Sequence, residues 1–249
     1  HLDIDPAEIG KTIPIDIPIV GDIKEVLADV IQRLEEKNLG LETPWKINNN
    51  KRTLLSIRDA APVMQTIFNE LSNIDQNIHV STDVGRHQMW ANHYCTNPKH
   101  LPLITSGGLG TMGFGLPAAI GAWFADPDTP VVSLSGDGSF MMNMQEFIVA
   151  VENQIPLTVI ILNDYRLGMI RELQTSFYNG HYTTHNFSEH VSFTKFAEAM
   201  GGKGFDVKST EKIGSTIRKA VQSRVPTIID FDLENISKSA LLSLNSVAS

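Results

Sequence analysis

Two patterns of hydrophobic and polar residues alternate along the chain. Uninterrupted apolar runs, each followed by small or polar residues, are typical of buried strands. We place them at 77–85, 101–105, 129–138, 157–164 and 226–233. Between them apolar residues recur at helical spacing. We expect helices at 56–72, 142–154, 193–202 and 211–223, and another after the glycine-rich stretch 104–113. Apolar strands alternating with helices predict an α/β fold with a doubly wound parallel sheet, covered on both faces.

The N-terminal fifth of the chain has a different organisation. Residues 1–5 look like the end of a strand, and 22–37 have helical spacing. The segment 38–52 is polar and rich in Gly, Pro and Asn, which is typical of a linker. We therefore expect two parts: residues 1–50, the tail of a second α/β domain with a linker, and 51–249, the main domain. Because the chain starts at His1 with no Met, we expect a fragment whose N-terminal part is missing.

Ser56 and Asp59 both precede or begin the apolar pattern of the helix expected at 56–72. Their side chains can accept hydrogen bonds from the first free backbone amides of a helix. We expect one of the two to be its N-cap.

Composition excludes several classes of protein. The chain has 249 residues, is 42% hydrophobic, and carries a net charge of −8 without a long Lys/Arg run. A nucleic-acid-binding face is therefore not expected. No apolar run reaches the ~18 residues that a membrane span needs, and Cys95 is the single cysteine. A chain without disulfides fits a reducing compartment, so we expect a cytoplasmic protein.

Asp137 follows one apolar strand, and Asp164 follows the next, 27 residues later. If these parallel strands are neighbours, both carboxylates reach the crevice where open α/β sheets bind ligands. Gly136 and Gly138 let the backbone approach a ligand closely, and Ser139 with the amides after it opens a helix that favours phosphate. Two carboxylates and phosphate oxygens form a natural Mg²⁺ site, so the pattern predicts a diphosphate held through a divalent metal.

Two other interpretations of these residues stay open at this point. A Gly-Asp-Gly after a strand is often only a turn, as is Asn-Asp. The stretch Gly108–Gly113 also matches G-x-G-x-x-G, and Asp137 follows it by 24 residues, which would fit a nicotinamide dehydrogenase. That alternative leaves Asp164 without a role, and the strand before the motif is short.

Several longer motifs carry a family resemblance. DVGRHQMW at 83–90, TSGGLGTMGFGLPAAIGA at 105–122, GDGSFMMNMQE at 136–146 and LGMI at 167–170 together resemble the C-terminal, diphosphate-binding domain of the acetohydroxyacid (acetolactate) synthases. These are thiamine diphosphate enzymes, and the fold implied is the thiamine diphosphate-binding fold. Residues 1–11 resemble the end of that family's middle domain.

The resemblance implies roles for individual residues. Mg²⁺ is expected on the carboxylates of Asp137 and Asp164 and on the backbone carbonyl of Arg166. Met112 is expected to wedge the cofactor into a bent form, and the carbonyl of Gly110 to meet its aminopyrimidine amine. The residues expected to contact the cofactor are Gly85, Arg86, His87, Gly110, Met112, Gly136, Gly138, Ser139, Gly168 and Met169.

The chain departs from the family pattern at three positions. Asp164 stands where the family usually has Asn, and Arg86 where it usually has Gln. We hypothesise that the two are linked, with Arg86 offsetting the charge of Asp164 across the diphosphate. Leu173 stands where the biosynthetic family has a Trp that favours 2-oxobutyrate. On the substrate side, with Met169, this Leu predicts a preference for pyruvate.

The activity implied is thiamine diphosphate- and Mg²⁺-dependent acetolactate synthesis, in which pyruvate is decarboxylated and the resulting enamine is ligated to a second 2-oxo acid. Alternatives are another 2-oxo acid carboligase, decarboxylase or oxidase, and an isolated cofactor-binding fragment without catalysis. The family's essential glutamate lies on a separate N-terminal domain, so no catalytic residue is expected on this chain, and the chain alone should be inactive.

The resemblance also concerns assembly and pathway. The family's active site forms between subunits, so a homodimer or homotetramer is expected, and a regulatory small subunit is compatible with it. Whether FAD binds the middle domain is left open. So is the choice between branched-chain amino acid biosynthesis and a catabolic role.

Overall fold

The computed structural model describes residues 1–11, 13–37, 55–74, 77–95, 101–188 and 190–236. The chain separates into two compact units, residues 1–52 and 53–249, and each is described by itself. The linker expected at 38–52, and the boundary placed near residue 50, lie outside the described residues.

The first unit is small. Strands β1 (Leu2–Asp3) and β2 (Ile19–Val20) pair in parallel, and the helix predicted at 22–37 is present as α1 (Ile23–Glu36). Asp22 caps α1, because its carboxylate accepts a 2.8 Å hydrogen bond from the amide of Lys24. No residue of α1 is buried in the described structure. The apolar side chains of this helix therefore do not pack into a core within the described residues.

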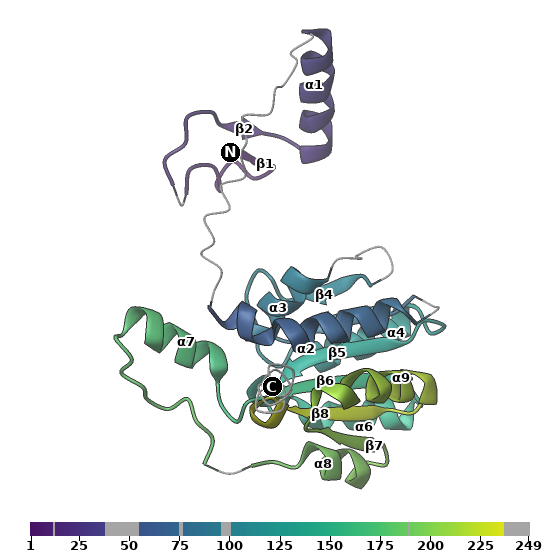
Figure 1. Ribbon diagram of the computed structural model, residues 1–249. Coiled ribbons are helices and arrows are strands. Elements are labelled where there is room, and N and C mark those ends of the chain that lie inside the picture. The colour runs from purple at the N-terminus through teal and green to yellow at the C-terminus, as the bar shows by residue number, and fades with distance from the viewer. Residues whose placement is uncertain (12, 38–54, 75–76, 96–100, 189, 237–249) are drawn as a thin grey trace, which may run out of the picture. The chain divides into compact units, whose positions relative to one another are not determined.

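The second unit is built on six parallel strands, which confirms the predicted α/β doubly wound class (Figure 1). Their order across the sheet is β4 (Leu103–Thr105), β3 (His79–Thr82), β5 (Val131–Gly136), β6 (Leu157–Asn163), β8 (Thr227–Asp232) and β7 (Lys203–Val207). β7 was not predicted, because its sequence KGFDV has no apolar run and most of it is not buried.

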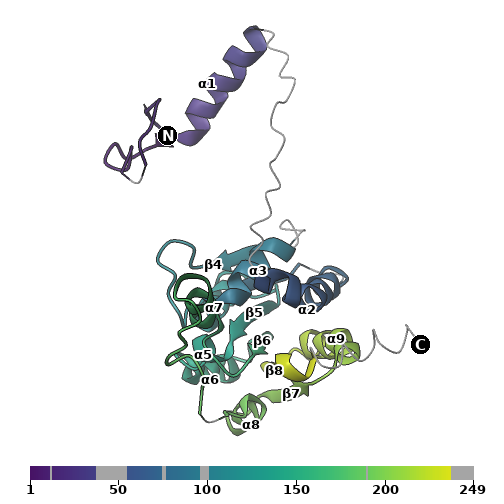
Figure 2. The same ribbon diagram turned by 60° about the vertical axis from the view of Figure 1, so that its left-hand side comes forward.

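Helices cover both faces of this sheet, as the continuous apolar strands require (Figure 2). Alternate strand residues point to opposite faces: Val132 and Leu134 pack into one core cluster, and Val131 into the other. The first cluster includes side chains of α2 (Leu55–Ser72), α3 (Arg86–Tyr94) and α9 (Ile213–Ser223). The second includes side chains of α4 (Gly115–Ala125), α6 (Phe147–Glu152) and α8 (Phe193–Ala199).

Some local predictions were wrong. Helix α2 begins at Leu55, so Ser56 and Asp59 lie inside it, and neither is its N-cap. The helix expected at 142–154 is shorter and divided, with the 3₁₀ turn η1 (Met144–Glu146) leading into α6. Helices α3 and α7 (Gly168–Phe177) were not predicted at all.

The topology determines where a ligand can bind. From β3 the chain proceeds first to β4 on one side and then to β5 on the other. The loops that leave the carboxyl ends of β3 and β5 therefore diverge, which opens a crevice at this switch point. None of the helices in the described ranges is long and apolar enough to cross a membrane.

Candidate functional site

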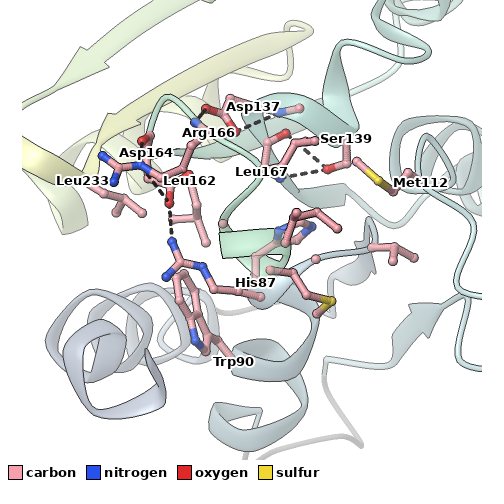
Figure 3. A pocket seen from close by; sticks show the side chains of 18 residues that line it. His87, Trp90, Met112, Asp137, Ser139, Leu162, Asp164, Arg166, Leu167 and Leu233 are labelled. Atoms are coloured by element: carbon pink, nitrogen blue, oxygen red, sulfur yellow. Dashed lines mark hydrogen bonds and ion pairs between the residues drawn. The ribbon is translucent and has the colours of Figure 1, made fainter. Parts of the chain in front are cut away.

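A pocket lies at the switch point, at the carboxyl ends of the central strands (Figure 3). Its walls come from five places in the chain: the ends of β3, β5 and β6 with the segments that follow them, Met112 in the loop after β4, and Leu233 just after β8. Segments separated by up to about 150 residues thus meet at one edge of the sheet, as the doubly wound topology dictates.

Asp137 and Asp164 both line this pocket. Strands β5 and β6 are direct neighbours, with Gly136 opposite Leu162, which confirms the expected strand pairing. Asp137 is buried at the start of the single helical turn α5 (Asp137–Phe140). Its Oδ1 accepts from the amide of Gly138 at 2.8 Å, and its Oδ2 from the amide of Arg166 at 3.1 Å.

Burial makes ionisation of both carboxylates costly, and the charge of Asp164 adds to the cost at Asp137. Burial, reinforced by the charge of Asp164, raises the pKa of Asp137 to about 7. Burial also raises the pKa of Asp164, even though the guanidinium groups of Arg86 and Arg166 oppose the shift. A divalent cation between them would remove this penalty, because an opposite charge favours the ionised form.

Arg86 is held by three neighbours. Its Nη2 donates to Oδ2 of Asp164 in an ion pair (Figure 3), and its guanidinium lies over the ring of Trp90, 5.2 Å from the centroid. A Cβ added to Gly168 would collide with the same guanidinium. We expected Arg86 to offset the charge of Asp164 across a diphosphate; in this structure the contact is direct.

The imidazole of His87 is enclosed between two glycines. A Cβ on Gly136 would lie 3.1 Å from Nδ1, and one on Gly85 would lie 2.7 Å from Cε1. Burial lowers the pKa of His87 to about 3, so the ring is neutral at pH 7. Its Nε2 has no hydrogen-bond partner in the described structure. A polar group of a ligand in the pocket would satisfy this nitrogen.

The donor set fits a metal-bound diphosphate. Among the described residues no three His, Cys, Asp or Glu side chains converge on one point, so the protein does not form a closed cage. Mg²⁺ is commonly held by one or two carboxylates together with phosphate oxygens. Gly138 keeps the wall close to the pocket, because a Cβ there would lie 2.5 Å from Leu167 and 3.0 Å from Phe187.

Most of the expected site residues meet in this pocket. Those that line it are Gly85, Arg86, His87, Met112, Gly136, Asp137, Gly138, Ser139, Asp164, Arg166, Gly168 and Met169. Two do not. Gly110 lies in the glycine-rich loop with φ +64°, and Leu173 lies on α7 with 43% of its surface exposed.

The pocket also contains apolar residues that were not expected there: Val84, Trp90, Leu162, Leu167, Ile170 and Leu233. Trp90 is 5% exposed and also belongs to the first core cluster. It lies one helical turn after Arg86, a spacing that could have suggested their contact. Leu233 directly follows β8. Only the order of the strands in the sheet could have indicated that this residue lies at the pocket.

Comparison with known proteins identifies the relatives of this chain. The family model described as thiamine pyrophosphate enzyme, C-terminal TPP binding domain, matches residues 83–231; thiamine pyrophosphate (TPP) is thiamine diphosphate. This range contains the Gly108–Gly113 loop, so the motif belongs to this family and the dehydrogenase alternative is set aside.

Curated relatives point the same way. The chain is 37% identical to a probable acetolactate synthase large subunit of Methanococcus aeolicus, over 94% of this chain and 42% of that protein. It is 36% identical to the corresponding protein of Methanocaldococcus jannaschii, with the same coverage. It is 39% identical to an acetolactate synthase of Arthrospira platensis, over 92% and 41%. The chain thus spans about two fifths of the length of these relatives, and it belongs to the thiamine pyrophosphate enzyme family, whose C-terminal TPP-binding domain it contains.

Proposed function

We propose that the chain supplies the diphosphate-binding half of an acetolactate synthase active site, dependent on thiamine diphosphate and Mg²⁺. One observation carries the proposal: two carboxylates with raised pKa values, Asp137 and Asp164, share a pocket with His87, whose Nε2 has no hydrogen-bond partner among the described residues. Membership in the family and the names of its relatives support the same conclusion.

In this proposal the residues that line the pocket have different roles. Asp137 and Asp164, with the backbone of Arg166, would hold Mg²⁺. The negative charge of a bound diphosphate would favour the protonated form of His87, in which Nε2–H can donate to a diphosphate oxygen. Met112 lines the pocket and would be the apolar residue that wedges the cofactor into its bent form. When bound, thiamine diphosphate supplies the carbanion-stabilising chemistry that decarboxylation of a 2-oxo acid requires.

Substrate choice belongs to α7 in this proposal. Leu173 has no aromatic ring with which to favour a longer second substrate, so pyruvate is preferred over 2-oxobutyrate as acceptor. A contact of this kind is worth about 1–3 kcal/mol of discrimination. Met169, which lines the pocket one turn earlier on the same helix, would face the donor substrate.

The remaining parts of the proposal rest on the family resemblance alone. The glutamate that activates the cofactor would come from another domain of a partner subunit, so the working protein is a cytoplasmic homodimer or homotetramer. FAD on the middle domain, a regulatory subunit and a role in branched-chain amino acid biosynthesis are further expectations of the same kind.

The test is product formation by the full-length protein. With thiamine diphosphate, Mg²⁺ and pyruvate it should form acetolactate, and added 2-oxobutyrate should yield little acetohydroxybutyrate. Release of CO₂ without acetolactate would assign the protein to the decarboxylases or oxidases. Cofactor binding with no turnover would leave a binding module. Failure to bind thiamine diphosphate at all would refute the proposal.

A further inference from the structure

We propose that Asp83 is a positioning residue: its buried carboxylate ties the glycine-rich loop to the end of β3, and so sets the spacing between the two sides of the pocket. The inference rests on the proposed function in one respect only, namely that the ligand whose two ends contact these sides is thiamine diphosphate.

Asp83 is the first residue after β3, and 1% of its surface is exposed. Its Oδ1 accepts hydrogen bonds from the amide of Val84 at 2.7 Å and from that of Gly113 at 2.9 Å. Its Oδ2 accepts from the amide of Gly115 at 2.9 Å. Its own amide donates to the carbonyl of Leu134 at 2.8 Å, which anchors it to β5. Through its backbone amide and its carboxylate, this one residue joins the end of β3 to β5 and to the loop.

The loop is built to receive this carboxylate. A Cβ on Gly115 would lie 2.8–3.1 Å from backbone and Cβ atoms of Asp83, so only glycine allows this approach. Gly113 has φ +88°, a conformation that favours glycine. From the other side, Nδ2 of Asn143 donates to the carbonyl of Gly113 at 2.9 Å. The Gly113 residue is thus held at its amide and at its carbonyl.

A carboxylate is required by the arrangement of the donors. Three backbone amides converge on the carboxylate of Asp83, and the side chain of Ser139 also hydrogen-bonds it. Burial raises the pKa of Asp83 and the amide hydrogen bonds oppose that rise. Gly115 begins α4, whose first amides carry partial positive charge. An asparagine would present an NH₂ group to at least one of these donors and leave it unpaired.

The clamp connects two walls of the pocket. Asp83 leads directly into Val84, Gly85, Arg86 and His87, all of which line the pocket, and its loop partner Gly113 directly follows Met112, which lines it too. Neither Asp83 nor Asn143 lines the pocket. Loss of the clamp should therefore displace the Met112 side and leave the Asp137–Asp164 end in place.

The first test needs no cofactor. In Asp83→Asn, amide hydrogen exchange across 106–116 should accelerate by about tenfold or more, because buried donors lose their acceptor. Exchange in β5 and β6 should stay as in the wild type. Ser81→Ala is the matched control: it removes a buried 2.8 Å hydrogen bond from Oγ to the carbonyl of the same Gly115. Unchanged exchange in Asp83→Asn would overturn the inference.

The second test separates the two ends of the pocket in the full-length protein. Asp83→Asn should weaken thiamine diphosphate binding by about tenfold or more and change Mg²⁺-pyrophosphate binding by less than about twofold, since pyrophosphate does not reach Met112. Asn143→Ala, which releases the loop from its less buried side, should show the same split. Equal losses for both ligands in both variants would mean general destabilisation and refute positioning. Failure of the wild type to bind thiamine diphosphate would refute the proposed function, while hydrogen exchange would still decide on Asp83.

Discussion

The strand ends that form the pocket and helix α7 beside it differ in how firmly they are held. Asp137, Gly138 and Ser139 are all buried, and Asp137 accepts two backbone hydrogen bonds. Helix α7 has no buried residue in the described structure and stands away from the sheet in Figure 1. Its Leu173 and Phe177 are 43% and 75% exposed.

A short antiparallel contact with the segment around Asn186 fixes the base of α7. The amide of Leu167 donates to the carbonyl of His185 at 2.7 Å, and that of Phe187 donates to the carbonyl of Tyr165 at 3.2 Å. Beyond that base, Arg171 and Gln174 hydrogen-bond His185 and Thr183 of the segment that follows. No residue of α7 is buried in the described structure, so little packing opposes a change of side chain at an exposed position such as Leu173. Substitutions at the strand ends should therefore alter cofactor binding and stability. Substitutions at exposed positions of α7 beyond its first turn, such as Leu173, should alter substrate choice alone.

The strongest test of this contrast is Asp137→Asn. Replacing a carboxylate that binds the metal should weaken Mg²⁺-thiamine diphosphate binding by about 100-fold or more, since even outer partners of a metal site contribute 10–100-fold. Titration calorimetry in the full protein would measure the affinity. Asp126→Asn, at an exposed carboxylate beside His79, is the control and should bind normally. An Asp137→Asn variant that binds Mg²⁺-thiamine diphosphate with wild-type affinity would contradict the proposed metal site.

Gly138→Ala should reveal how tightly the strand end is packed. The new methyl group would lie 2.5 Å from Leu167 and 3.0 Å from Phe187, so we expect a loss of about 1–3 kcal/mol in the free energy of unfolding. Gly121→Ala in α4 has nothing within 4 Å and should stabilise the protein by about 0.5–1 kcal/mol. Denaturant unfolding would measure both changes in the free energy of unfolding. Changes of the same sign in the two variants would contradict the close packing at the strand end.

A double-mutant cycle on Arg86→Gln and Asp164→Asn should give a coupling of about 1–2 kcal/mol in cofactor affinity. The two side chains form a direct ion pair, so each single change leaves the other charge without its partner. The double variant should bind better than the sum of the single losses predicts. Additive losses would show that the two departures from the family pattern are independent.

Asp230 tests whether a buried carboxylate at the strand ends makes the free energy of unfolding depend on pH. Burial, with help from Asp206 and Asp232, raises its pKa from 3.8 to about 6. Because the folded pKa is raised, this group destabilises the fold increasingly as pH rises from about 4 to about 6. Asp230→Asn should flatten that part of the stability curve and raise the free energy of unfolding at pH 7 by on the order of 1 kcal/mol.

The acceptor role of Asp230 is kept in that variant, since the amide oxygen can still accept from Nδ2 of Asn163, which is 3.0 Å from Oδ1. Asp126→Asn should show the opposite sign, because hydrogen bonds from Thr129 and His79 lower the pKa of that carboxyl. A stability curve for Asp230→Asn that keeps its slope between pH 4 and 6 would rule out this account.

Leu173→Ala should have the smallest effect on the fold. With 43% of the side chain exposed, stability should change by less than about 0.5 kcal/mol, and cofactor affinity should stay the same. Leu173→Trp should shift the product ratio toward acetohydroxybutyrate in competition assays. A large loss of stability or of cofactor affinity in Leu173→Ala would erase the contrast between α7 and the strand ends.

The sequence revealed the parts of the fold that depend on local pattern. Apolar runs located β5, β6 and β8, and the spacing of Asp137 and Asp164 led to one shared pocket. Edge strand β7 was missed, because an edge strand with one polar side lacks a continuous apolar run.

Contacts between distant residues were not accessible in the same way. Arg86 and Asp164 are 78 residues apart, and their direct ion pair depends on the rotamer of Arg86 above Trp90. Asp83 looks like any aspartate that ends a strand. Only the convergence of three amides from two segments distinguishes it from a turn residue.

The position of β8 has a consequence for how the protein is made. This last strand, buried along its whole length, pairs with β6 on one side and with β7 on the other. During synthesis β6 therefore keeps an open edge until residue 232 has left the ribosome, and long-range pairing of this kind is slow. A nascent chain that ends before Thr227 carries four paired strands, an exposed edge prone to aggregation, and a pocket that lacks Leu233.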